Sequence, residues 1–186
     1  MGKNVKIFGT AGQAGYSLTN LMVTLCIFTI TACIAVPTFI FLIPDAQRRG
    51  AARDLYATFR LAQLSAIRSG VHCTVTLNQT VDGVVYSFVA FEDRDNDMEY
   101  DPGSDKVIKK VLWGTDQNYE HISLQGHELS SNDDGLPHIG FRSNGFPTEN
   151  GGFDLSNGPE RTVTLQDTQN KEMTVVITQA GHVRIL

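Results

Sequence analysis

The chain has 186 residues with 15 basic and 20 acidic side chains, which gives a net charge of -5. The residues from 71 onward carry 8 basic and 18 acidic side chains, a net charge of -10. So acidic a region argues against sequence-independent binding of nucleic acid, because that binding needs clustered Lys and Arg to neutralise phosphates. The 116 residues after residue 70 suffice for one domain with a modest core.

Cysteine usage excludes a disulfide-stapled domain. Of three cysteines, Cys26 and Cys33 lie in an uncharged N-terminal segment, and only Cys73 lies beyond it. The region after residue 70 therefore cannot form an internal disulfide. Cys73 falls in an alternating pattern and is predicted to be a core or half-buried residue.

Residues 1–15 contain two lysines and no acidic residue, and they are rich in Gly, Ala and Thr. A segment of this composition is interpreted as a processing segment and excluded from the fold. Three arginines between residues 48 and 53 follow the next segment closely. Charge alone therefore does not decide which end of the chain would stay in the cytoplasm.

Residues 16–44 contain no charged side chain, and the first charge after them is Asp45. A hydrocarbon core of about 30 Å needs roughly 20 apolar residues in a helix, so this segment is long enough to cross a membrane. Its threonines are tolerated in lipid, because a hydroxyl can bond a carbonyl of its own helix. These threonines are Thr19, Thr24, Thr29 and Thr31. The segment is predicted to be one membrane-spanning helix.

The junction between these two segments has a distinctive order of residues. Gly15 is followed by the aromatic Tyr16, a small hydroxyl residue, a leucine and then the apolar segment, and Pro37 lies twenty-one residues after Tyr16. This order resembles the cleavage site of type IV pilins and of the pseudopilins of type II secretion. The resemblance implies that a prepilin peptidase cuts between Gly15 and Tyr16 and methylates the new amino group of Tyr16.

The chain departs from that class at the fifth residue after the junction, where Asn20 stands in place of the usual Glu. In that class the Glu pairs with the N-terminal amine of a neighbouring subunit. An amine with a pKa of about 8 is largely charged at neutral pH, and burying it unpaired costs several kcal/mol. Asn20 supplies no counter-charge. The resemblance therefore leads to the hypothesis of a subunit that initiates or caps a filament at its tip.

A second interpretation of the same segment stays open. Residues 30–32 followed by Cys33 fit the loose pattern of a lipoprotein signal. Against this interpretation, uncharged and mostly apolar residues continue to Pro44, whereas a lipid-anchored protein normally turns polar directly after the cysteine.

Residues 45–70 have an amphipathic helical pattern. Their main apolar positions, spaced by four, three and four residues, are Leu55, Phe59, Ala62 and Ala66. We therefore expect the membrane helix to continue and to end at Gly70, because glycine favours the C-terminal cap of a helix. Pro37 and Pro44 each remove a backbone donor, so bends or melted turns are expected there.

The region 71–186, called the head below, changes to a period of two, which is typical of strands. The predicted strands are 71–77, 84–91, 106–113, 120–124, 138–142, 161–166, 173–179 and 182–185. Residues 78–83 are predicted to be a hairpin turn, and residues 126–159 are predicted to be mostly loop. The predicted fold class is α+β, a long N-terminal helix packed on an antiparallel β-sheet head.

The head has three features that appear in this order: an acidic loop between two strands, Phe141 with Gly145, and the terminal sequence Gly181-His182-Val183-Arg184. Together they resemble the GspH/FimT branch of minor pilins and pseudopilins. With the junction motif, the resemblance spans nearly the whole chain.

The acidic loop places carboxylates at alternate positions, as calcium-binding loops do. These residues are Asp93, Asp95, Asp97, Glu99 and Asp101. The loop departs from an EF-hand because Met98 stands at the sixth position, where glycine is needed, and Ser104 stands at the twelfth, where a bidentate Glu is needed. We expect a solvated loop that keeps sheet edges apart by charge. Calcium binding is the alternative, and no other cofactor is predicted.

The sequence does not indicate an enzyme. His127-Glu128 lacks the second histidine of a zinc protease, since Ser131 occupies that position. The sequence has no nucleophile elbow of Ser or Cys and no glycine loop for phosphate. A structural subunit without catalytic activity is therefore predicted.

Some members of the branch are implicated in DNA uptake through a Gly-Arg-x-Arg arrangement near the C-terminus. Gly181 and Arg184 match it here, whereas His182 replaces the first Arg. Lys171 and Arg161 would add positive charge if the last strands pair. DNA binding in competence is therefore kept as an alternative function.

These patterns predict a leader (1–15), a membrane and assembly helix (16–44), an amphipathic helix (45–70) and the head (71–186). By the resemblance, the chain is a minor pilin or pseudopilin with one pass through the bacterial inner membrane and its head in the periplasm. Its implied partners are sister subunits, the prepilin peptidase, the inner-membrane assembly platform and, before assembly, membrane lipid. A plain anchored periplasmic protein is the remaining alternative.

Overall fold

The computed structural model describes residues 17–114, 119–149 and 159–186, with the backbone alone described at 37–41. By its internal contacts the chain divides into two units, residues 1–41 and residues 42–186. The ten strands of the described chain all belong to the second unit.

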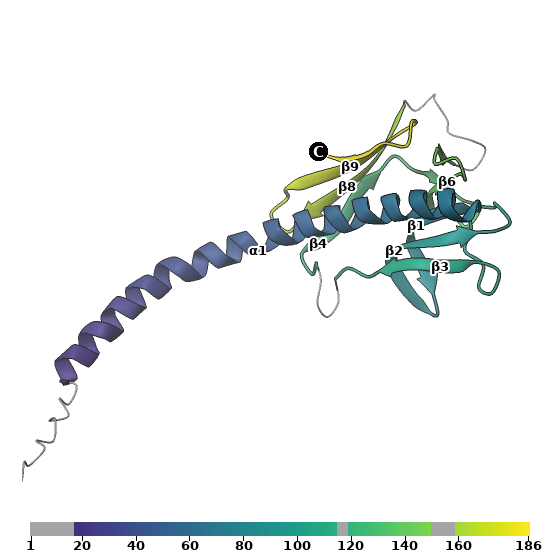
Figure 1. The fold of residues 1–186 in the computed structure, drawn as a ribbon. Helices are drawn as coiled ribbons and strands as arrows, with labels where there is room; N and C mark the ends of the chain where they lie inside the picture. Colours follow the sequence, from purple (N-terminus) through teal and green to yellow (C-terminus); the bar gives the residue numbers. More distant parts are fainter. Residues whose placement is uncertain (1–16, 115–118, 150–158) are drawn as a thin grey trace, which may run out of the picture. The chain divides into compact units, whose positions relative to one another are not determined.

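Helix α1 (Leu18–Ser69) is the only helix of the described chain (Figure 1). It ends as predicted at Gly70, whose φ is 72° and whose amide donates to the carbonyl of Ala66 at 3.0 Å. The backbone is helical through Pro37 and Pro44, so of the predicted bends or melted turns the melted turns are excluded there. Each proline removes one donor, and the remaining hydrogen bonds of the turn keep it helical.

The first sheet has the strand order β3-β2-β1-β6-β5, with β7 paired to β6, and its pairs are antiparallel. Its strands are β1 (His72–Val81), β2 (Val84–Asp93), β3 (Lys106–Val111), β5 (Ser130–Ser131), β6 (Pro137–Phe141) and β7 (Pro147–Thr148).

The predicted hairpin of β1 and β2 is confirmed, but its turn is only Asp82-Gly83. Both residues have positive φ, 53° and 78°, as a tight two-residue hairpin turn requires. The predicted turn at 78–83 was therefore too long.

The second sheet has the order β10-β9-β8-β4, also antiparallel. Its strands are β4 (Ile122–His127), β8 (Glu160–Asp167), β9 (Glu172–Thr178) and β10 (Val183–Ile185). The prediction of mostly loop at 126–159 missed β5 and β7, because two-residue strands show no period.

One hydrophobic core lies between the part of α1 from residue 51 onward and the two sheets (Figure 1). The helix contributes fully buried Ala51, Ala52, Leu55, Phe59, Ala62 and Ala66. The first sheet contributes Cys73, Val75, Leu77, Phe88, Ala90, Ile139 and Phe141, and the second contributes Ile122, Val163, Leu165, Val175, Ile177 and Val183. The burial of Cys73 confirms its prediction as a core residue. The α+β prediction is also confirmed.

A polar contact fixes the helix against two tight turns of the head. The side-chain amide Nε2 of Gln63 donates to the carbonyls of Gly145 (2.8 Å) and Gly181 (3.0 Å). Both glycines have positive φ, 82° and 80°. A Cβ on Gly181 would lie 2.6 Å from Gln63 Nε2 and 2.8 Å from the carbonyl of Gly145. These are the two glycines on which the resemblance of the head depends, and both positions require glycine.

Candidate functional site

The uncharged part of α1 has an exposed apolar surface in the described segment Leu18–Val36. The helical segment Leu18–Val36 has a mean hydropathy of 2.0, and none of it is buried. Its large apolar side chains are between 52% and 75% exposed. As predicted for three of its threonines, Thr24, Thr29 and Thr31 bond carbonyls three or four residues earlier. The segment has the length and composition to cross a membrane, and it can equally bury its surface against other helices.

The predicted processing residues Gly15 and Tyr16 lie outside the described residues. Asn20 lies in the first turn of α1, where its side chain is exposed and its carbonyl accepts a hydrogen bond from Thr24 Oγ1 at 3.0 Å. The first turn contains no acidic residue. No carboxylate of this turn can therefore balance an amine brought to it by a neighbour.

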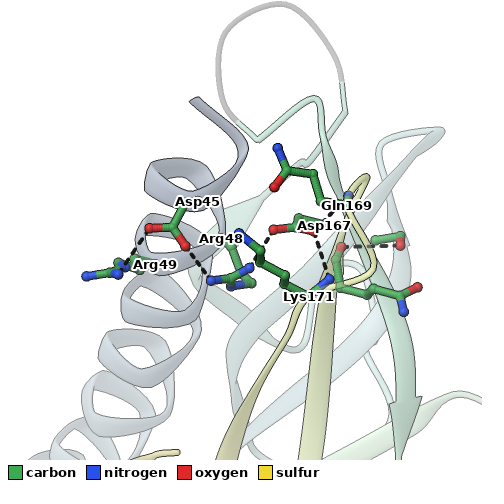
Figure 2. Close-up of polar contacts among 8 residues, drawn as sticks. Asp45, Arg48, Arg49, Asp167, Gln169 and Lys171 are labelled. Carbon is green, nitrogen blue, oxygen red and sulfur yellow. Dashed lines mark hydrogen bonds and ion pairs between the residues drawn. The ribbon is translucent and has the colours of Figure 1, made fainter. Parts of the chain in front are cut away.

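An ionic cluster with a buried centre, called the Arg48 clasp below, joins the helix to the end of β8 (Figure 2). Its members are Asp45, Arg48, Arg49 and Asp167. Arg48 is only 7% exposed and donates through its two terminal nitrogens to Asp45 and Asp167. Arg49 is paired with the second oxygen of Asp45 at 3.1 Å. The clasp thus holds the first turns of the head-bound helix on the β8–β9 hairpin.

Asp167 is the deeply buried member of the clasp, 3% exposed. Burial alone would raise the pKa of its carboxyl, but backbone hydrogen bonds from Lys171 and Gln169, together with Arg48, outweigh burial and hold the pKa below its ordinary value. The donors are the amides of Gln169 (2.8 Å) and Lys171 (3.0 Å). The sequence shows Asp167 only as a turn residue, because its ion pair spans 119 residues.

The acidic loop folds around the carboxylate of Asp93 at the end of β2. Asp93 is fully buried and accepts hydrogen bonds from the amides of Asn96 (2.7 Å) and Met98 (3.1 Å) and from Thr74 Oγ1 (3.1 Å). Burial raises the pKa of Asp93 to about 6, although these hydrogen bonds oppose the rise. Met98 turns inward and covers Gly140 of β6. Asp93 therefore organises the loop, a role that the alternating pattern did not predict.

The structure brings together three of the five predicted calcium ligands. Carboxylate oxygens of Asp93, Asp95 and Asp97 lie within 4.8 Å of one another, whereas Glu99 accepts a hydrogen bond from the amide of Asp134 at 3.0 Å. For both Glu99 and Asp101, partial burial and then neighbouring carboxylates raise the pKa. Calcium needs six to eight oxygens, and Asp93 already accepts three hydrogen bonds inside the loop. These residues fit calcium poorly.

The residues considered for DNA do not form a basic cluster in the described chain. Arg184 of β10 is paired with Glu160 at 2.9 Å, and it lies opposite Val176 of β9. Lys171 precedes Val176 by five residues, or about 16 Å along a strand. Lys171 therefore lies far along the hairpin from Arg184. Arg161 is buried and makes a two-pronged ion pair with Glu149, at 2.7 and 2.9 Å. Its charge is therefore neutralised inside the head.

Three comparisons with known proteins extend these observations. By structure, the chain is similar to the type IV minor pilin FimU of Pseudomonas aeruginosa at 14% identity, with a TM-score of 0.47 over 74% of this chain and 91% of that chain. It is also similar to the minor pseudopilin EpsH from the type 2 secretion system of Vibrio cholerae at 17% identity, with a TM-score of 0.45 over 75% of this chain and 96% of that chain. No curated protein matches the chain by sequence.

The sequence also matches a protein family. The family model described as type II transport protein GspH aligns with residues 51–181, which is about seven tenths of the chain. The aligned region runs from the first buried helix residue of the core to Gly181, and so covers the head-bound helix and most of the head. This match confirms the resemblance to the GspH/FimT branch, and the chain belongs to the GspH family of type II transport proteins.

Proposed function

We propose that this chain is a minor, structural subunit of a type IV pilus or of a type II secretion pseudopilus. In this proposal the segment 16–44 anchors the chain in the inner membrane, with the head in the periplasm. The same segment later packs against sister subunits after extraction by the assembly platform. The family match over 51–181 supports this role.

The observation that carries the proposal is the contrast between burial and composition in α1. The large apolar side chains of Leu18–Val36 are exposed, although the helix goes on to bury Leu55, Phe59 and other apolar residues in the head. An apolar surface of this size costs free energy in water. A second environment, first lipid and then neighbouring helices, removes that cost.

Processing at the junction is the first test. The full chain is produced in cells with an active prepilin peptidase, and its N-terminus is read by mass spectrometry. We expect a methylated Tyr16 as the first residue. A Gly15→Leu variant, whose bulkier side chain should block cleavage, is the control and should keep residues 1–15. An intact leader on the unaltered chain would contradict the proposal.

The position within a filament is the second part of the proposal. Because Asn20 cannot pair with a neighbour's amine, the subunit should sit at the tip, where it initiates or caps. An Asn20→Glu variant should restore the pair and enter the shaft, which immunogold labelling of assembled filaments can locate. Labelling that stays unchanged would argue against a tip position set by Asn20.

A further inference from the structure

A pocket of about 320 Å³ opens beside the Arg48 clasp. One wall consists of Arg48, Arg49 and Arg53 of α1, and the other of Met173 of β9 and Ile185 of β10. Arg49 and Arg53 are four residues apart and therefore lie on one face of the helix. The pocket thus combines a guanidinium wall with an apolar wall, and its volume suits a small polar headgroup.

The charges around this pocket do not cancel. Both terminal nitrogens of Arg48 are paired, with Asp45 and Asp167, and Arg49 shares Asp45. In the described part of the chain Arg53 has no ion pair, and its side chain is exposed. Arg53 is therefore the arginine of the pocket whose charge no carboxylate of the clasp balances. A phosphodiester carries one negative charge, and guanidinium groups bind phosphate oxygens in a two-pronged geometry.

One buried hydrogen-bond donor in the arginine wall of the pocket has no partner. The Nε atom of Arg48 has no hydrogen-bond partner, although the residue is only 7% exposed. An unpartnered buried donor typically costs about 1–3 kcal/mol. The clasp therefore keeps one spare hydrogen-bond donor in a residue that also lines the pocket.

The place of these arginines in the sequence indicates the source of the anion. They begin four residues after the uncharged segment ends at Pro44. The first cations after a membrane segment lie at the level of the lipid headgroups. In a phospholipid the phosphate is joined through glycerol to apolar acyl chains, and this order matches a pocket with Arg53 on one wall and Met173 and Ile185 on the other.

We infer that this pocket binds the phosphodiester headgroup of an anionic phospholipid while the chain waits in the membrane. Arg53 is the principal cation, Arg49 assists it, and Met173 and Ile185 contact the glycerol and the start of the acyl chains. The inference rests on the proposed membrane anchoring and adds a lipid class to it. By this inference, the apolar segment and one specific lipid both attach the unassembled subunit to the membrane.

The test uses the full chain in nanodiscs made of equal amounts of phosphatidylglycerol and phosphatidylcholine. Lipids that stay on the released protein are counted by native mass spectrometry. We expect phosphatidylglycerol to be retained at least about tenfold over phosphatidylcholine. Arg53→Gln should lower this preference about fivefold, in line with the worth of one basic residue at an anionic membrane surface. Arg48 is left unchanged because it holds the helix on the head.

The matched control is Arg68→Gln, which removes one exposed arginine about 22 Å farther along the same helix. It should change lipid retention less than twofold. An equal effect of Arg53→Gln and Arg68→Gln would overturn the inference, because net charge alone would then explain binding. Retention of phosphatidylglycerol should also survive an excess of inorganic phosphate at constant ionic strength. Displacement by phosphate would reveal a site for a free anion and overturn the lipid assignment.

Two further outcomes separate this inference from the proposed function. If Tyr16 is processed and the chain enters filaments but no lipid preference is found, the inference fails and the proposed function stands. If the chain does not associate with nanodiscs at all, the membrane anchoring itself fails. An Arg53→Gln variant that retains lipid normally but no longer joins filaments would show that the pocket binds an acidic surface of a sister subunit, and this would also overturn the lipid assignment.

Discussion

The two parts of α1 are both rich in apolar residues, yet they have opposite surroundings. In Leu18–Val36 apolar residues lie on every side of the helix and remain exposed. In residues 45–69 most apolar residues, Leu55 and Phe59 among them, lie on one side and are buried against the two sheets. Arg53 and the exposed Leu64 lie on the other side. The distribution of apolar residues around a helix, more than their number, therefore indicates what the helix packs against.

This difference assigns separate tasks to the two parts. The head-bound part contributes to the folding stability of the head, because its side chains are removed from water within the same chain. The large side chains of Leu18–Val36 stay exposed, so we expect this part to add little to that stability and, under the proposed function, to contact lipid or other subunits instead. Substitutions that are chemically identical in the two parts should therefore have very different effects.

The largest expected effect comes from a matched pair of phenylalanines. Phe59 is fully buried and Phe28 is 73% exposed. Phe59→Ala should lower the free energy of unfolding of the head by about 3–5 kcal/mol through lost burial and a cavity, whereas Phe28→Ala should change it by less than about 0.5 kcal/mol. Unfolding of the full chain by urea in detergent can be followed by the fluorescence of Trp113, which contacts Phe88 at 5.4 Å between ring centroids.

Trp113 is the only tryptophan, so this signal reports on the head alone. Equal losses at the two positions would mean that the exposed part of α1 also packs on the head. The comparison between the two parts would then be wrong. A loss at Phe59 alone would support the separation.

The second prediction tests the Arg48 clasp, which marks the start of the head-bound part of α1. Asp167→Asn should leave Arg48 buried with only Asp45 as its counter-charge, and it should cost about 3 kcal/mol of unfolding free energy. The control is Glu160→Gln, which breaks the exposed ion pair with Arg184 and should cost less than about 1 kcal/mol. A small loss at Asp167 would mean that the clasp does not hold the helix.

The clasp also predicts a pH dependence. The pKa of Asp167 is lower in the folded chain than its ordinary value. The contribution of Asp167 to the free energy of unfolding is therefore fully present above a pH of about 4, the unfolded pKa of Asp. That contribution is lost as the pH falls through the lower, folded value. In acid, the unfolding free energies of the unaltered chain and of Asp167→Asn should therefore converge. Parallel pH profiles would contradict this assignment.

Local patterns predicted the elements of the fold well, and long-range contacts account for what they missed. The period at Leu55 and Phe59 identified the buried face of the helix, and the alternation from residue 71 identified the long strands. No local pattern marks the Arg48–Asp167 pair of the clasp or the Gln63 contact, because each joins residues more than 80 positions apart.

The acidic loop also shows that a local sequence pattern does not predict contacts between distant residues. The alternating carboxylates favoured a solvated loop, with five equivalent oxygen ligands for calcium as the alternative, but Asp93 is buried and accepts three internal hydrogen bonds, whereas Asp95 and Asp97 are exposed. Identical side chains thus have unequal roles, since Asp93 alone accepts a hydrogen bond from Thr74 in the neighbouring strand β1. Burial by tertiary contacts cannot be read from spacing alone.

The smallest effect concerns the far end of the head-bound helix, where Gln63 contacts two turns. Gly181→Ala should cost about 2 kcal/mol, because its positive φ disfavours a side chain and the new Cβ would lie 2.8 Å from the carbonyl of Gly145. Gly70→Ala has a similar φ but open space around it, so it should cost only about 1 kcal/mol. The difference between the two variants, measured by the same urea unfolding, isolates the close packing of the two turns around Gln63. Equal costs would mean that the turns yield to the methyl group, and the rigid attachment of the helix would then depend on the core and the Arg48 clasp alone.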